Sequence, residues 1–306
     1  QFAALLLPLI LAGGVSSLNT VVDRWVASRL PVGSISAINY SGRVWGIPIS
    51  LMSGPIATAI FPSLAALAAD KASLRILHNK VRHTAAFIAW IMIPCSAGLI
   101  VLAQPIVRLL FQRGAFTAGA TMLTAACVQM YTLGLLGQAL MPILQRVFYS
   151  FEDTVTPLLV GIGIVGANMT GNIILSRYMG AAGIALATSI TVALGCVLYA
   201  ALMRRFFRQE DRSTPAYPLM RELAKTLLAT IPVASIAWVG QTWLRSEAAF
   251  LPLAVKTIAV VVAAAFVYAL CSAILHIDGW RTVRGRLVRH HDTEKTDKDL
   301  AASEKS

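Results

Sequence analysis

Charged residues are scarce in this 306-residue sequence. Asp, Glu, Lys and Arg make up 13% of it, while 57% of its residues are hydrophobic. A soluble globular domain carries about 25% charged residues. The low charge and a mean hydropathy of +0.70 therefore argue against a soluble domain and predict a protein embedded in a membrane.

Long runs without any charge divide the chain. Each is close to or longer than the roughly 20 residues with which an α-helix crosses a bilayer. The runs are Phe2–Val22, Val44–Ala69, Thr84–Val107, Gly114–Gln145, Thr154–Ser176, Tyr178–Met203, Thr226–Leu244 and Thr257–Ile277. Backbone groups in hydrocarbon must pair within their own segment, and the sequence has no alternating strands of the barrel type. The predicted fold class is all-α, a polytopic membrane bundle with one helix for each of the eight runs.

The spacings that catalysis or metal binding requires are also missing. The four cysteines all lie inside apolar runs and are expected to be packing residues. The sequence has no His/Glu metal pair, no glycine-rich phosphate loop and no nucleophile elbow. These absences disfavour a membrane enzyme.

A net charge of +12 is compatible with nucleic-acid binding, but the placement of the charges indicates otherwise. Eighteen of the 26 Lys and Arg follow the second, fourth, sixth and eighth runs, and six lie on the other side. This bias matches the positive-inside rule, so both chain ends are expected in the cytoplasm and no nucleic-acid partner is predicted.

The runs group into parts. We expect six helices in residues 1–203, a basic cytoplasmic loop at 204–225, an appended helix pair at 226–277, and a basic then polar cytoplasmic tail at 278–306. Gln1 stands directly against an apolar run without a polar leader. We therefore expect an N-terminal part to be missing.

Three prolines mark the run Val44–Ala69. Pro48, Pro55 and Pro62 are each seven residues apart, almost two helical turns, so they lie near one face. Each removes a backbone donor. Membrane helices tolerate proline, but three in register favour a bending helix, and these residues are the predicted hinge.

Two arginines lie within or near the membrane and are candidates for substrate binding, Arg43 and Arg24. Arg43 could pair with an acid such as Asp23, or it could snorkel toward the interface. Ionisable residues inside membranes more generally mark a substrate pathway. A guanidinium is a planar, permanently charged fork, so an anionic head group is the expected partner.

Several oxygen-bearing side chains could converge on a second site. Asn168 and Asn172 are spaced i, i+4 on one expected helix, Thr188 lies on the next, and Asp23 is on the first. Together their oxygens could hold Na⁺ or accept a proton. From the residues alone, ordinary hydrogen bonding between helices explains them better.

Several ordered blocks carry a resemblance to a known family. They are LNTVVDRWVASRLPVGSISAINYSGRVWGIPISL, GPIATAIFPSLAALAA, QPIVRLLFQRGAFTAGAT, LQRVFYSFEDTVTPLLVG and MGAAGIALATSI. In these blocks the sequence resembles the MurJ/MviN family, the lipid II flippases of the MOP exporter superfamily. The resemblance covers Phe2 to about Met203, and the last two runs match in kind rather than in motif.

The resemblance implies the second six-helix lobe and the extra helix pair of a fourteen-helix transporter, with the N-terminal lobe missing. It implies a bacterial inner-membrane protein, an undecaprenyl-linked peptidoglycan precursor as substrate, and a groove for the lipid tail beside the last two helices. Arg43 matches the arginine of the family's Tyr-Ala-Asp-Arg block, although Gly42 replaces the acid. The resemblance favours the cation site, with the Ile184 carbonyl as a fifth ligand.

The predicted mechanism is alternating access, in which the head group engages Arg43, the lobes rock, and the membrane potential or a Na⁺ or H⁺ gradient supplies the bias. Membrane lipids are the other expected partners. Two alternatives remain: a flippase for another polyprenyl-linked glycan or a drug exporter, and a membrane scaffold that transports nothing. An exporter of cationic drugs would favour a cavity acid where this chain has Arg43.

Overall fold

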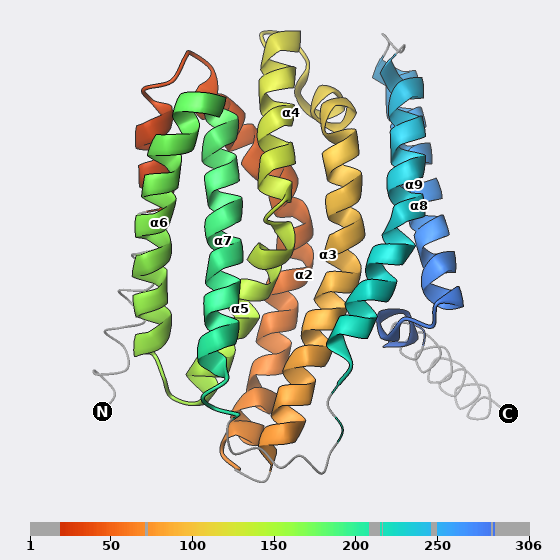
Figure 1. Cartoon of the computed structure of the whole chain (residues 1–306). Helices are drawn as coiled ribbons and strands as arrows, with labels where there is room; N and C mark the ends of the chain where they lie inside the picture. The colour runs from red at the N-terminus through yellow and green to blue at the C-terminus, as the bar shows by residue number, and fades with distance from the viewer. Residues whose placement is uncertain are drawn as a thin grey trace, which may run out of the picture.

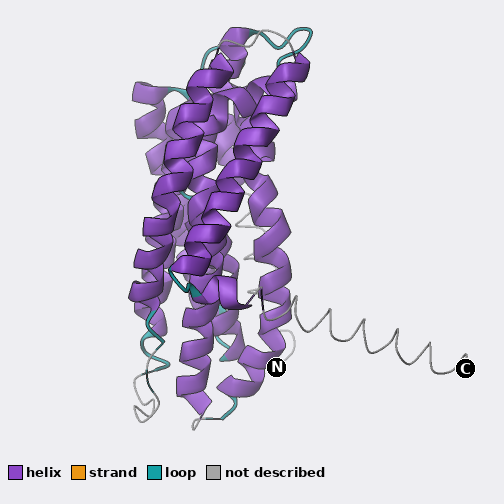
Figure 2. Cartoon of the chain, turned by 90° about the vertical axis from the view of Figure 1, so that its right-hand side faces the viewer, coloured by secondary structure: helices purple, strands orange, loops and turns teal. Residues whose placement is uncertain are grey.

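The computed structural model describes residues 19–70, 73–207, 215, 217–245, 250–282 and 284. Within these ranges the chain is a bundle of long helices joined by short loops, and no strand is present (Figures 1 and 2). After a helical segment at residues 19–27, the helices are α2 (Ser34–Ala68), α3 (Leu74–Phe111), α4 (Ala118–Thr132), α5 (Leu135–Ser150), α6 (Val155–Met179), α7 (Ala181–Met203), α8 (Leu219–Arg245) and α9 (Phe250–Ile274).

The charge-free runs account for these helices. Six helices are long and apolar enough to cross a membrane, and α4 with α5 makes a seventh span if the bent pair is counted as one. The second to eighth predicted spans therefore fall on described helices. The first, residues 2–22, lies mostly outside the described residues, and so does most of the predicted tail. The all-α membrane class is confirmed.

The fourth predicted span, Gly114–Gln145, is not one straight helix. It is divided into α4 and α5, whose axes differ by 44°. The division falls at Leu133–Gly134, where Gly134 packs so closely on α7 that an added Cβ would lie 2.7 Å from the Cα of Ser189. No proline marks this position, so the charge-free run alone did not predict the break.

A tight turn joins the antiparallel helices α6 and α7. Its single linking residue, Gly180, has φ 58° and ψ −133°, a conformation that residues with a Cβ rarely adopt. The turn brings the polar residues of α6 and α7 face to face over several turns, which positions the cluster described below.

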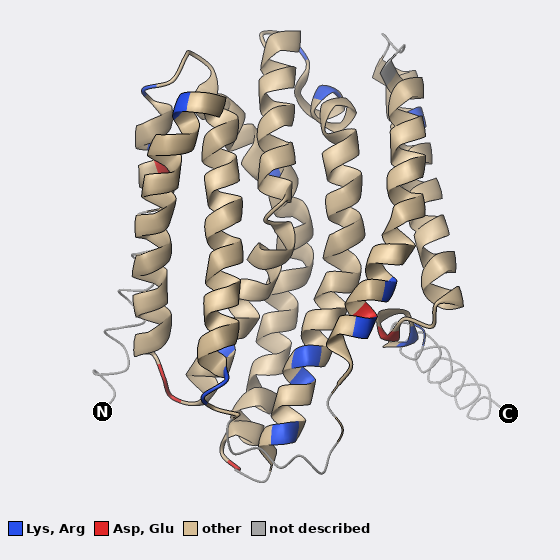
Figure 3. Ribbon diagram, in the orientation of Figure 1, with Lys and Arg blue, Asp and Glu red and all other residues tan. Residues whose placement is uncertain are grey.

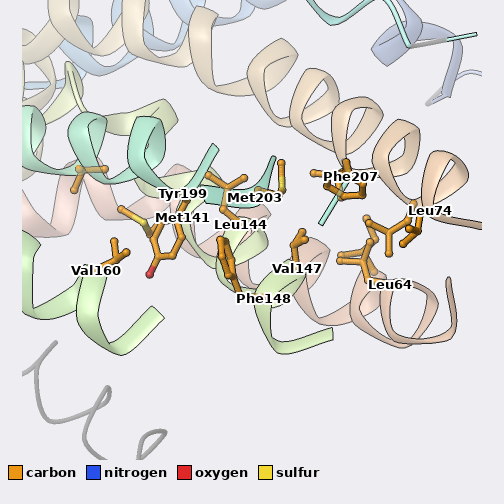
Figure 4. Packing of buried hydrophobic residues seen from close by; sticks show 14 residues of the cluster. Leu64, Leu74, Met141, Leu144, Val147, Phe148, Val160, Tyr199, Met203 and Phe207 are labelled. Carbon is orange, nitrogen blue, oxygen red and sulfur yellow. The ribbon is translucent and has the colours of Figure 1, made fainter. Parts of the chain in front are cut away.

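The main apolar core lies where α2, α3, α5, α6 and α7 meet, at the end of the bundle where α2 ends and α3 begins (Figure 4). Phe148 and Tyr199 are fully buried there, with ring centroids 5.4 Å apart. Leu64 and Leu77 join α2 to α3 in the same cluster. This core ties the five helices into one unit at that end.

The pair α8 and α9 packs against the rest of the bundle through α3, which lies beside α8 (Figure 1). At one end, Tyr217 links three elements. Its backbone N–H donates to Asn79 of α3 at 2.8 Å, and its hydroxyl donates to Asp278 at 3.0 Å. Burial, together with this bond to Asp278, raises the pKa of the Tyr217 phenol. The buried Glu222 of α8 accepts from the Asp278 backbone N–H at 3.0 Å.

Lys and Arg gather at the end of the bundle where α3 and α8 begin and α7 ends, with fewer at the opposite end (Figure 3). We call the first the basic end. The described cations of this end are Arg75, Lys80, Arg82, Arg204, Arg205, Arg221, Lys225, Arg281 and Arg284. The helices therefore run between two ends of unequal charge, as the sequence predicts.

Gly134→Ala is expected to lower the melting temperature, because the new Cβ meets the Ser189 backbone and cannot be accommodated without moving α5 from α7. Overpacking of this kind costs about 1–3 kcal/mol. Gly163→Ala on α6 is the matched control, since nothing lies within 4 Å of its added Cβ. Equal melting temperatures for the two variants in detergent would contradict the close approach.

Candidate functional site

A polar stripe runs along the exposed side of α2. Its members recur at three- or four-residue intervals, with Ile47 as the apolar member between them, and so share one side of the helix. They are Ser36, Asn39, Arg43, Ser50, Gly54 and Thr58. Ala37, Ser41 and Val44 are buried on another side of α2, and the apolar side chain of Leu51 is also exposed. A stripe of this composition is unsuited to hydrocarbon and indicates a surface that faces water, substrate or another protein segment.

Arg43 is the only ionised member of this stripe and lies nine residues after the first residue of α2, roughly 14 Å along the helix. Its guanidinium carbon lies 5.5 Å from the ring centroid of Tyr40, one turn earlier. Tyr40 in turn packs on Phe111 and Phe116. Among the described residues Arg43 forms no ion pair, so the pairing with Asp23 considered above does not occur.

Arg24 does not join Arg43. It is exposed on the helical segment at residues 19–27. Its side chain makes none of the hydrogen bonds or ion pairs found in the described part of the chain. The structure therefore presents the two predicted substrate arginines as separate surface cations.

The predicted cation ligands, by contrast, are connected by hydrogen bonds. Asn172 Nδ2 donates to Asp23 Oδ1 at 2.6 Å and to Asn168 Oδ1 at 2.8 Å. Asn168 Nδ2 donates to Thr188 Oγ1 at 3.2 Å, and Thr188 Oγ1 donates to the Ile184 carbonyl at 3.2 Å. We call these five residues the polar cluster. The i, i+4 spacing places Asn168 and Asn172 on one side of α6, and Ile184 and Thr188 on one side of α7. The tight turn at Gly180 then brings these two sides together.

The donor set of the polar cluster fits a small monovalent cation. Asn168 and Asn172 are fully buried, and Asn172 Oδ1 has no hydrogen-bond partner. An orphaned buried carbonyl oxygen is costly and suits a cation ligand. The other oxygens are carboxylate, amide, hydroxyl and backbone carbonyl, all hard donors. The described residues contain no group of three His, Cys, Asp or Glu side chains that could hold a metal, and a single carboxylate matches a single positive charge.

Two neighbours of the polar cluster were not predicted. Thr191 accepts from Asn168 Nδ2 at 3.4 Å. Asn19 precedes Asp23 by one helical turn, and its Oδ1 is also buried without a partner. Both follow the i, i+3 or i, i+4 spacing from a predicted member, which is the signal that could have identified them.

Arg146 was counted only as a cation at the end of a span, but it lies inside α5 and reaches α2. It donates to the Ala57 carbonyl and, at 3.2 Å, to Thr58 Oγ1. Its guanidinium carbon lies 5.7 Å from the centroid of the Phe61 ring. Pro62 lacks the N–H that would bond the Thr58 carbonyl, so Arg146 supports α2 beside one of the predicted hinge residues.

The predicted hinge prolines all lie inside α2, which is helical from Ser34 to Ala68. Pro55 and Pro62 are exposed, whereas Pro48 is half-buried and lines the cavity described next. The helix is not interrupted at any of the three. A hinge at these positions stays a prediction.

An apolar cavity of about 420 Å³ lies between α3 and the pair α8 and α9, with Pro48 of α2 at its edge. Its walls include Trp90 and Gly98 of α3, Val233 of α8 and Tyr268 of α9. Tyr268 donates its hydroxyl to the Trp90 carbonyl at 2.5 Å. With the polar group of Tyr268 satisfied, the lining suits an apolar ligand.

The break between α4 and α5 lies against the polar cluster. Ser189, which follows Thr188, places its hydroxyl 2.6 Å from the Met130 carbonyl and 3.1 Å from the Tyr131 carbonyl. These carbonyls belong to the last turn of α4. The Tyr131 ring stacks on Trp45 of α2, with centroids 5.2 Å apart and planes inclined by 19°.

Solved structures share this arrangement of helices. A structure of lipid II flippase MurJ in the inward closed conformation matches with a TM-score of 0.66 and 26% identity, over 86% of this chain and 52% of that one. A MOP superfamily transporter from Pyrococcus furiosus matches with a TM-score of 0.58 at 15% identity, over 91% of this chain and 64% of that one, which shows the fold alone. The fold is therefore that of a MOP superfamily transporter.

The family model for lipid II flippase MurJ matches residues 1–260, and the chain belongs to that family. A probable lipid II flippase MurJ of Vibrio cholerae is 34% identical over 65% of this chain and 38% of its own length. One of Rhizobium meliloti is 29% identical over 87% of this chain and 49% of its own. The matched regions thus cover less than half the length of these relatives.

The family assignment confirms the resemblance read from the ordered blocks of sequence. It also agrees with a transporter rather than an enzyme, since the family is named for a flippase. The matched relatives are bacterial, and the described helices include several membrane spans. The chain is accordingly a membrane protein of a bacterial family.

Proposed function

We propose that this chain forms the C-terminal lobe of a flippase that moves lipid II from the inner to the outer leaflet of the bacterial cytoplasmic membrane. One observation carries the proposal: Arg43 presents an exposed guanidinium, without an ion-pair partner among the described residues, on the polar stripe of an otherwise apolar bundle. The family assignment and the MurJ structural match support it.

Arg43 is the proposed contact for the pyrophosphate of the substrate. Its fork donates two parallel hydrogen bonds to phosphate oxygens, and its charge is permanent. Asn39 and Ser50 flank it on the stripe and offer donors and acceptors to the sugar and peptide. Arg24 is proposed as a second anion contact once the missing lobe closes around the head group.

The polar cluster is the proposed site of the coupling cation, Na⁺ in preference to H⁺. Asp23, Asn168, Asn172, Thr188 and the Ile184 carbonyl would supply its ligands. Bound there, the cation would neutralise Asp23 and fix the segment at residues 19–27 against α6 and α7. A cation that moves inward through a membrane potential releases about 2.3 kcal/mol per 100 mV.

The apolar cavity beside α8 and α9 is the proposed place for part of the polyprenyl tail. Its walls carry no charged residue, and α8 and α9 expose apolar side chains such as Leu228 and Phe266 around it. A tail held there stays in an apolar environment while the head group passes along α2. The apolar surface of the tail then does not have to be exposed to water.

Alternating access is the proposed cycle. The basic end faces the cytoplasm, as the positive-inside rule predicts, and both chain ends lie there. The head group enters at that end, and bending of α2 at Pro48, Pro55 and Pro62 lets the lobes rock. The two states must differ in their affinity for head group or cation, because only such a difference can drive the change.

A membrane scaffold without transport is the alternative of another class. It requires no charge at position 43, whereas a flippase does. A flippase for a different polyprenyl-linked glycan retains the need for Arg43 but changes the glycan preference. Substitution of Arg43 therefore distinguishes a flippase from a scaffold, and exchange of the glycan distinguishes a lipid II flippase from one for another glycan.

Arg43→Ala and Arg43→Glu are expected to abolish rescue of cells depleted of their own flippase, with the N-terminal half of a relative supplied upstream of the chain. Binding of lipid II in nanodiscs should weaken about ten- to hundredfold, the value of a charge-assisted hydrogen bond. Arg177→Ala, which removes an exposed cation from α6, is the control. Undiminished rescue and binding by both Arg43 variants would remove Arg43 from the substrate role.

Sodium is expected to raise the melting temperature of the chain relative to choline at equal ionic strength, because a ligand that binds only the folded state stabilises it. Asp23→Asn should abolish this rise, and Asn172→Asp should shift it to lower sodium concentrations by adding a second carboxylate. Thr170→Ala, on the exposed side of α6, is the control. A sodium response that Asp23→Asn leaves intact would refute the cation site.

Gly98→Leu tests the tail site. Nothing lies within 4 Å of a Cβ added at Gly98, so the leucine should enter the cavity without clash. We expect unchanged melting temperature and weaker binding of undecaprenyl phosphate in nanodiscs. Gly163→Leu, on α6 away from the cavity, should bind as the parent chain does. Equal affinity for both variants would place the tail elsewhere.

A further inference from the structure

Trp45 and Tyr131 connect the polar cluster to the helix that carries Arg43. Their stacked rings, 5.2 Å apart, join α2 to the last turn of α4. Tyr131 is only 5% exposed. Trp45 Nε1 is buried and has no hydrogen-bond partner, although a buried indole N–H usually has one. The contact between α2 and α4 therefore depends on ring packing rather than on a hydrogen bond from the indole.

The other side of Tyr131 meets the polar cluster. Its hydroxyl lies near enough to the Thr188 side chain and to Asp23 to interact electrostatically with both. Thr188 Oγ1 is also the oxygen that Asn168 bonds. A cation that takes this oxygen as a ligand places its positive charge beside the Tyr131 hydroxyl. Tyr131 is thus placed to respond to whether the cluster is occupied.

The break between α4 and α5 places Tyr131 in the last turn of α4. Tyr131 is two residues before Leu133, where the helix is interrupted and the axis turns by 44°. Ser189 bonds the Met130 and Tyr131 carbonyls at this point, directly beside Thr188 in sequence. Ser189 of α7 therefore holds the backbone of Tyr131, one residue away from Thr188 of the polar cluster.

Trp45 transmits a shift of Tyr131 to the polar stripe because it shares a rigid helical turn with Arg43. Positions i and i+2 of a helix are separated by roughly 200° around its axis, so Trp45 points inward while Arg43 points outward. A displacement of the Trp45 ring must move this turn of α2. Arg43 then changes its position relative to any anion on the stripe.

We propose that Tyr131 is a positioning residue that, through its stack on Trp45, couples cation occupancy of the polar cluster to the orientation of Arg43. This inference rests on the proposed function, because it takes the cluster as a cation site and Arg43 as the anion contact. It assigns the coupling between the two sites to one ring stack at the α4–α5 break. Coupling between two sites requires a structural element whose conformation both sites influence. In this proposal that element is the break between α4 and α5.

The test measures how accessible one position of the polar stripe is to a water-soluble reagent. Every variant carries Asn39→Cys, one turn before Arg43 on the exposed side of α2. Its rate of reaction with a water-soluble maleimide is measured in nanodiscs, in NaCl and in choline chloride. Peptide mass spectrometry separates this site from the four native cysteines. The sodium-induced rise in melting temperature is recorded in parallel and reports binding at the cluster.

We expect sodium to change the reaction rate in the parent chain. Tyr131→Phe, which removes only the hydroxyl, and Trp45→Leu, which removes the stack, should each lose this change while keeping the sodium-induced rise in melting temperature. The double variant should lose no more than either single variant. Tyr199→Phe also removes a buried hydroxyl, but in the main core, and should keep both responses.

Three outcomes would overturn the coupling. Sodium-dependent rates that persist unchanged in both Tyr131→Phe and Trp45→Leu would show another route. A parent chain whose melting temperature rises with sodium while its rate stays constant would overturn the coupling and leave the cation site standing. Absence of both responses would overturn the cation site and the coupling together. The labelling rates do not depend on the result of the rescue test with the Arg43 variants. The proposed flippase function and the proposed coupling can therefore be refuted independently.

Discussion

Hydrocarbon offers no hydrogen-bond partner, and the arrangement of this bundle follows from that single constraint. Polar groups on α6 and α7 meet it by bonding one another, from Asn172 through Asn168 to Thr188. The guanidinium of Arg43 does not, since among the described residues it has only an aromatic ring beside it. One polar region is thus closed within the lobe, and the other is open at its surface.

The helices were predictable because charge is excluded from the membrane interior, and charge-free runs are visible in the sequence. The break at Leu133–Gly134 was not, because it arises where α4 and α5 fold against α7 and Ser189 takes over two carbonyls. The residues around Leu133 do not by themselves predict this contact with α7. Conversely, Pro48, Pro55 and Pro62 lie within α2 without interrupting it, and Arg146 donates to a carbonyl of this helix near Pro62.

The polar cluster was predicted in outline. The i, i+4 spacing of Asn168 and Asn172 is a property of one helix, so it can be read from sequence. Asp23 and Thr188 were grouped with them as oxygen-bearing side chains of other spans, and the resemblance added the Ile184 carbonyl. Tyr131, Trp45 and Arg146 were missed for a common reason. Each acts across helices that are distant in sequence, through a stack or a bond to a backbone carbonyl. Aromatic and basic residues in such runs look like ordinary packing or interfacial residues until the helices are placed.

The lengths of α2 and α3 carry a further consequence. With 35 and 38 residues, they measure about 52 and 57 Å along their axes, whereas the hydrocarbon layer is about 30 Å thick. Even at a tilt of about 40°, both span roughly 40 Å or more along the membrane normal, so their ends lie beyond the hydrocarbon layer. The start of α3 carries Arg75, Lys80 and Arg82, so at the basic end these two helices place a cluster of positive charge at the level of the lipid head groups, within reach of their phosphates.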